Sequence, residues 1–111
     1  EQYGGFQVSM GFSDLPYPIP NIRVENNPAP SHVRIGWLRS VAHIHHAFAV
    51  QSFTDELAAQ ARADRVEYLL KLLGTPRTID FGGEGITGWK ANPKHPFDTA
   101  RLRRVIEVVA E

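Results

Sequence analysis

The sequence of 111 residues predicts an α+β fold of one domain at most. Residues 1–44 alternate apolar and polar side chains and are interrupted by prolines, which is typical of mainly extended chain. Residues 45–74 place apolar side chains three and four positions apart, which indicates two adjacent helices. A glycine-rich loop at 75–97 and a helix at 98–111 complete the predicted order.

Three short strands are expected in the extended part, because apolar residues there recur at every second position. Three alternate prolines between the first two strands exclude a helix and keep the chain extended or in turns. A loop rich in asparagine and proline separates the second strand from the third. The alternating sets are Phe6, Val8 and Met10; Ile22 and Val24; and Val33, Ile35 and Trp37.

The first helix is expected at about 45–62, where an apolar stripe runs along one side. The second is expected to begin after Asp64, an N-cap residue with Glu67 three positions later as in a capping box. Gly74 should end it. The stripes are Ala49 or Val50, Phe53, Leu57 and Ala61 in the first helix, and Val66, Leu69, Leu70 and Leu73 in the second.

The stretch 77–96 is predicted to be a long loop with a short strand at 78–81. Its residues 83–88 match G-x-G-x-x-G, but Pro93 and Pro96 prevent the helix that a dinucleotide site needs. Asp98 should cap the last helix. The apolar face of that helix consists of Leu102, Val105, Ile106 and Val109.

Composition excludes several kinds of function. Twelve basic and twelve acidic side chains cancel, so no global field favours nucleic acid, membranes or acidic substrates. The absence of cysteine excludes a disulfide scaffold, an iron–sulfur site and a cysteine nucleophile within the chain. The first residue is Glu1 rather than methionine, so we expect a processed protein or a piece of a longer one.

Two features could carry chemistry. His43, His45 and His46 lie close together, with His32 upstream, and imidazoles are good metal ligands, although structural histidines explain the cluster better. Arg39 stands where extended chain meets the first helix, and there it could present its planar fork to a carboxylate or phosphate. The alternative is a surface arginine paired with Glu or Asp.

Four stretches resemble one family in matching order and spacing. Residues 17–23 resemble "Y-x-I-P-N-x-R" in the large subunits of xanthine dehydrogenases and aldehyde oxidases. Residues 36–58 look like the "G-x-W-R-S-V-G…N-A-F-x-x-E-S-F-I-D-E-L-A" run of isoquinoline 1-oxidoreductase beta subunits and membrane-bound aldehyde dehydrogenases. Residues 64–68 are similar to their "D-P-x-E-F/Y", and 102–111 to their closing helix.

This resemblance implies that residues 1–111 are one fragment of a larger molybdopterin-binding domain. The family binds a molybdenum ion on a pterin dithiolene and hydroxylates aldehydes or N-heterocycles with water-derived oxygen. The implied partners are the remainder of the large subunit, an iron–sulfur small subunit and a cytochrome c electron acceptor. The catalytic glutamate of the family would lie outside these residues, so we expect the fragment alone to be inactive and to self-associate.

The same resemblance implies where the cofactor would be contacted. The family has "F-R-G-F-G" beside the cofactor, at the positions of Leu38 to Val41 here. Arg39 would face the molybdenum pocket or pterin, Ser40 and Val41 would contribute backbone, and His45 replaces a family glutamine. Neither a metal ligand nor a catalytic residue is assigned. The glycine that follows in the family is Ala42, and Gln51 replaces a glutamate.

Two other hypotheses stay open. One is a non-catalytic interaction module that kept the fold and lost the chemistry. The other is a small metal-binding protein that uses the four histidines. The location of the parent protein also stays open between a periplasmic or membrane-associated one and a cytoplasmic one.

Overall fold

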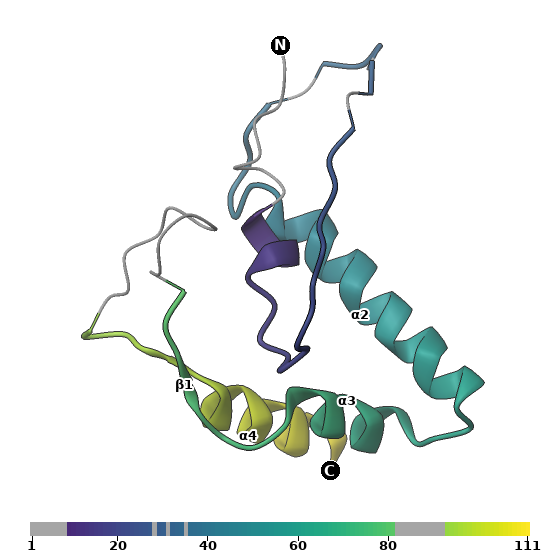
Figure 1. The fold of residues 1–111 in the computed structure, drawn as a ribbon, viewed down its shortest axis with the longest axis vertical. Helices are drawn as coiled ribbons and strands as arrows, with labels where there is room; N and C mark the ends of the chain where they lie inside the picture. The colour runs from purple at the N-terminus through teal and green to yellow at the C-terminus, as the bar shows by residue number, and fades with distance from the viewer. Residues whose placement is uncertain (1–8, 28, 31, 35, 82–92) are drawn as a thin grey trace.

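The computed structural model describes residues 9–27, 29–30, 32–34, 36–81 and 93–111. It is mostly helical, with one small antiparallel sheet. In Figure 1, α3 and α4 lie side by side and α2 runs away from them at an angle. The elements in order are η1 (Ser9–Ser13), α2 (His43–Gln60), α3 (Arg65–Leu73), β1 (Thr78–Ile79), β2 (Phe97–Asp98) and α4 (Thr99–Ala110).

Helix α2 confirms the predicted first helix, but the predicted stripe is not its buried side. Thr54 and Ala58 are the buried residues, whereas Phe53 is 60% exposed and Leu57 38%. The sequence pattern identifies apolar positions, but the contacts with η1 and α3 decide which side of α2 is covered. The predicted stripe is therefore left on the surface of the described chain.

Helices α3 and α4 begin where their aspartates predict. The Asp64 carboxylate accepts hydrogen bonds from the backbone N–H groups of Val66 and Glu67, both at 2.9 Å. The Asp98 carboxylate accepts one from Ala100 N–H at 2.8 Å. Gly74 ends α3 with φ +76°, a conformation that glycine adopts without steric cost. The N-caps of α3 and α4 and the C-cap of α3 are thus formed by residues close in sequence.

A two-stranded antiparallel ribbon joins β1 to β2, with Thr78 opposite Asp98 and Ile79 opposite Phe97. The strand expected at 78–81 is confirmed in its first half, but its partner Phe97–Asp98 was predicted as loop and helix cap. Residues 97 and 98 form a strand only because they pair with β1, which is distant in the sequence. The ribbon brings the start of α4 next to the end of α3.

The expected N-terminal strands are wrong where the structure describes them. Residues 22–24 and the described positions of 33–37 are exposed and form no strand. Met10 lies in η1 and is 2% exposed, while Phe6 and Val8 lie outside the described residues. A strand needs a partner for its backbone groups, and an alternating pattern does not supply one. The glycine motif at 83–88 also lies outside the described residues.

Arg77 joins three parts of the chain. Its guanidinium donates to the carbonyl oxygens of Leu73 at 2.8 Å and Pro16 at 2.5 Å. Its backbone N–H donates to the Thr99 hydroxyl at 2.8 Å, and its carbonyl accepts from Thr99 N–H at 2.9 Å. Thr99 is 1% exposed. One arginine therefore ties the N-terminal segment, the end of α3 and the start of α4.

The described chain exposes many large apolar side chains for its small core. Five apolar residues are buried, whereas fourteen large ones are exposed, among them Phe48 at 75% and Val109 at 82%. No helix of the described residues is long and apolar enough to cross a bilayer. The buried apolar residues are Met10, Tyr17, Ala42, Ala58 and Leu73.

We expect Arg77→Ala to lower the free energy of unfolding by about 2–4 kcal/mol, because charge-assisted hydrogen bonds to carbonyls are lost. Arg77→Lys should recover little, since an ammonium group cannot bridge the same carbonyls as a planar fork. Urea unfolding followed by circular dichroism measures both. The control is Arg101→Ala, an exposed arginine on α4, which should change stability by less than about 0.5 kcal/mol. Equal effects at both positions would contradict the role of Arg77.

Candidate functional site

A tight turn precedes α2 at the predicted cofactor-contacting residues. Val41 N–H donates to the Leu38 carbonyl at 2.9 Å, and His43 N–H donates to the Ser40 carbonyl at 2.9 Å. Ser40 has φ +64° and Val41 has φ +44°, both in the left-handed region. This region costs an L-residue about 1–2 kcal/mol, and a β-branched residue such as valine is a genuine outlier there. The turn is therefore strained.

Arg39 is exposed in this turn. Among the residues that the structure describes, no carboxylate lies within ion-pairing distance of it. Within the same residues, no acceptor takes the Ser40 N–H, whereas the Val41 N–H is already used inside the turn. A cation and one backbone donor are thus available next to each other. This pair can bind an anionic group.

The first turn of α2 separates the roles of its histidines. His46 Nδ1 donates to the Met10 carbonyl at 2.7 Å, and its ring stacks on Phe12 with centroids 4.1 Å apart. Gly11 has φ +106°, and a Cβ there would lie 2.9 Å from the His46 Cβ, so η1 packs closely against this residue. His45 is exposed and meets His46 edge-on, with ring centroids 4.4 Å apart. His46 therefore has a structural role, whereas His45 remains accessible to solvent.

These histidines do not form a metal centre. The described residues contain no group of three or more His, Cys, Asp or Glu side chains that could hold a metal ion. His32, His43, His45 and His46 are all among the described residues. The arrangement of these side chains therefore counts against the hypothesis of a small histidine-based metal protein.

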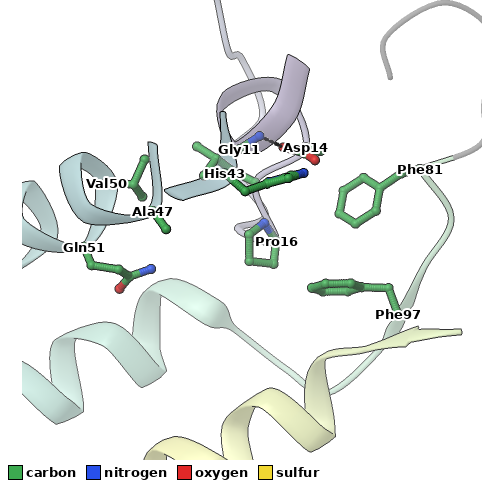
Figure 2. Close-up of a pocket in the computed structure, with 10 residues that line it drawn as sticks. Gly11, Asp14, Pro16, His43, Ala47, Val50, Gln51, Phe81 and Phe97 are labelled. Atoms are coloured by element: carbon green, nitrogen blue, oxygen red, sulfur yellow. Dashed lines mark hydrogen bonds between the residues drawn. The ribbon is translucent and has the colours of Figure 1, made fainter. Parts of the chain in front are cut away.

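An open groove of about 500 Å³ lies between η1 with the residues that follow it, α2, and Phe81 and Phe97 beside the β1–β2 ribbon. Phe81 and Phe97 form one wall, edge to face with centroids 5.2 Å apart (Figure 2). Gln51 lies in the groove and donates from Nε2 to the Tyr17 hydroxyl at 3.1 Å. The lining residues are Gly11, Asp14, Leu15, Pro16, His43, Ala47, Val50, Gln51, Phe81 and Phe97.

Arg39, Ser40, Val41 and His45 do not line this groove. Sequence reasoning missed the groove because its walls come from three distant segments, which only the fold brings together. Gln51 departs from the family pattern, but spacing alone gives no sign that it shares a cavity with the two phenylalanines. The turn before α2 and the groove are therefore two separate places on the protein surface.

The chain is 45% identical over 75 residues to one subunit of the nicotinate dehydrogenase of Pseudomonas putida. Over this stretch the two chains are homologous. The matched residues are 68% of this chain and 6% of that subunit, so the chain spans a small part of the relative's length. No protein-family model matches the chain, and no solved structure does.

We expect Ser40→Gly to raise the free energy of unfolding by about 0.5–1 kcal/mol, because glycine removes the cost of the left-handed conformation. The gain is smaller than that cost, since glycine also has more freedom in the unfolded chain. Ser52→Gly inside α2 is the matched control and should lower stability by about 0.5 kcal/mol. Urea denaturation of both variants is the measurement, and a loss of stability at both positions would argue against strain at Ser40.

Proposed function

We propose that this chain is part of the molybdopterin-binding subunit of an oxidoreductase that hydroxylates its substrate with water-derived oxygen. The observation that carries the proposal is the homology over 75 residues to the nicotinate dehydrogenase subunit. The family resemblance of residues 17–23, 36–58, 64–68 and 102–111 points the same way. In this proposal residues 1–111 form one piece of a larger cofactor-binding domain.

The relative also favours one substrate class. Its name gives nicotinate as the compound that the enzyme oxidises, and nicotinate is an aromatic N-heterocycle. The resemblance alone left aldehydes and N-heterocycles open. We therefore propose an aromatic N-heterocycle as the substrate of the enzyme that contains this chain.

The turn before α2 is the proposed point of cofactor contact. Arg39 supplies a fixed positive charge, and the adjacent Ser40 N–H supplies a hydrogen-bond donor. Val41 closes the turn through its bond to Leu38 and so holds the donor in place. A cation and an oriented N–H stabilise negative charge on a bound group without reorganising. The donor set therefore fits an anionic, oxygen-rich cofactor.

His45 is the fourth proposed contact. It is exposed on the first turn of α2, after the strained turn, and its ring lies edge-on to that of His46. A neutral imidazole donates or accepts one hydrogen bond at each nitrogen, whereas an amide offers a donor and an acceptor together. The bound cofactor would supply the redox chemistry, and these residues would hold and orient it.

The exposed apolar surface supports the proposed partners. Ile44 and Phe48, one helical turn apart on α2, are 51% and 75% exposed, and Phe53 is 60% exposed on another side of the helix. A helix with apolar residues on several sides is normally buried in a larger core. We propose the remainder of the large subunit as its cover, with an iron–sulfur subunit and a cytochrome c as further electron-transfer partners. The same surface would also serve a non-catalytic interaction module.

We expect stoichiometric molybdenum in the protein that contains this chain, purified from its native host and measured by inductively coupled plasma mass spectrometry. The expectation rests on the homology, because the cofactor would be bound by the whole subunit. Another molybdenum enzyme from the same cells serves as the control for cofactor supply. If this protein lacked molybdenum while the control enzyme contained it, the proposal would be overturned. The hypothesis of a non-catalytic interaction module would then remain.

We expect Arg39→Ala in that full-length protein to lower kcat/KM for an N-heterocyclic substrate by about a hundredfold, since one preorganised charge is lost. Arg39→Lys should fall between, because a lysine keeps the charge without the planar fork. Arg34→Ala, an exposed arginine in the same segment, is the matched control. Molybdenum content is measured for each variant. If an Arg39→Ala protein with full molybdenum content kept its kcat/KM, Arg39 would not be a cofactor contact.

A further inference from the structure

The groove between η1, α2 and the two phenylalanines contains one carboxylate, that of Asp14. Its Oδ1 accepts a hydrogen bond from Gly11 N–H, which holds the carboxylate beside the backbone of η1. Among the described residues, no lysine, arginine or histidine forms an ion pair with Asp14. Asp14 is half-buried, so solvent screens its charge only in part. The groove therefore holds a negative charge that the described part of the chain does not neutralise.

Two aromatic rings line the same groove. Phe81 and Phe97 pack edge to face, with centroids 5.2 Å apart and ring planes at 75° (Figure 2). The face of an aromatic ring carries partial negative charge, so it attracts cations and the edges of other rings. Phe97 is 41% exposed, so a bound molecule can reach its ring. The carboxylate and the rings thus favour the same kind of ligand, one that combines a positive charge with an aromatic ring.

The rest of the lining sets the size and polarity of that ligand. The open space is about 500 Å³, which is in the range of pockets for small molecules. The His43 imidazole and the Gln51 carbonyl oxygen are groups that can accept a hydrogen bond from a ligand N–H. No lysine or arginine lines the groove, so a bound anion would have no such cation to neutralise it. The aliphatic lining residues are Leu15, Pro16, Ala47 and Val50.

We propose that this groove binds a small, flat aromatic cation, with the positive group at Asp14 and the ring against Phe97. The carboxylate oxygen that Gly11 does not use accepts the hydrogen bonds of the charged N–H groups. A ring in the groove also buries apolar surface against the aliphatic lining, which adds to the attraction between charges. The proposal rests on this groove and not on the molybdenum function or on Arg39, which does not line it.

Three probes of matched size test the charge. Benzamidine carries a cation on a benzene ring, benzamide is its neutral counterpart and benzoate its anionic one. We expect benzamidine to bind the 111-residue chain with a dissociation constant of about 1 mM, as is usual for so small a ligand. Benzamide and benzoate should each bind at least about tenfold more weakly, because neither pairs with the carboxylate as a cation does.

Two-dimensional NMR titrations measure these affinities and locate the bound probe. The backbone amide signals of Gly11 and Gln51 should move as benzamidine is added, because both residues line the groove. Equal or tighter binding of benzamide or benzoate would overturn the proposal. So would shifts confined to Arg39 and Ser40, since these residues lie outside the groove.

Asp14→Asn keeps an acceptor for Gly11 N–H and removes the charge, so it should raise the dissociation constant of benzamidine about tenfold. The control is Glu56→Gln, which removes an exposed charge on α2 outside the groove and should change nothing. Phe97→Leu should weaken binding about threefold through loss of the ring, with Phe48→Leu as its control. The same NMR spectra show whether each variant is folded, and the comparison of probes needs no variant. Unchanged affinity in folded Asp14→Asn protein would contradict the proposal.

Discussion

The hydrogen bonds of Arg77 connect the main segments of the described chain. Its guanidinium reaches carbonyls of Pro16 and Leu73, and its backbone pairs with Thr99, so three segments far apart in the sequence meet at one residue. Pro18 packs on the cap of α3, since its Cγ would lie 3.1 Å from a Cβ placed at Gly74. With few buried apolar residues, this small fold depends on directional polar contacts more than on an extensive core.

The position of α2 follows from that constraint. Tyr17 is 7% exposed and receives a hydrogen bond from Gln51, while His46 binds the Met10 carbonyl, so the N-terminal segment is fixed along one side of α2. The other sides keep Phe48 and Phe53 in solvent. Burying such side chains stabilises each by about 1.5–3 kcal/mol. A polypeptide that covered this surface of α2 would therefore gain binding free energy by burying these side chains.

Backbone strain and the proposed cofactor contact lie in the same turn before α2. Ser40 and Val41 adopt a left-handed conformation that glycine would adopt without cost, and this turn is the one that presents Arg39 without a described acidic partner. Strain of this kind persists where the surrounding structure over-determines it, and it is concentrated at ligand-binding positions. The turn begins the longest helix of the described chain, which gives its backbone a rigid support.

The sequence alone determined the three main helices and the caps of the last two, because capping by Asp64, Asp98 and Gly74 is chemistry between near neighbours. The family resemblance that it carries is supported by the homology over 75 residues. The role of Arg39 as a cofactor contact stays a prediction. Tertiary structure decided which side of α2 is buried, that Phe97 pairs with Ile79, and that the groove has walls from three segments. The alternation at 22–24 predicted a strand that the structure does not form. Periodicity fixes where side chains point, whereas burial and pairing depend on what packs against them.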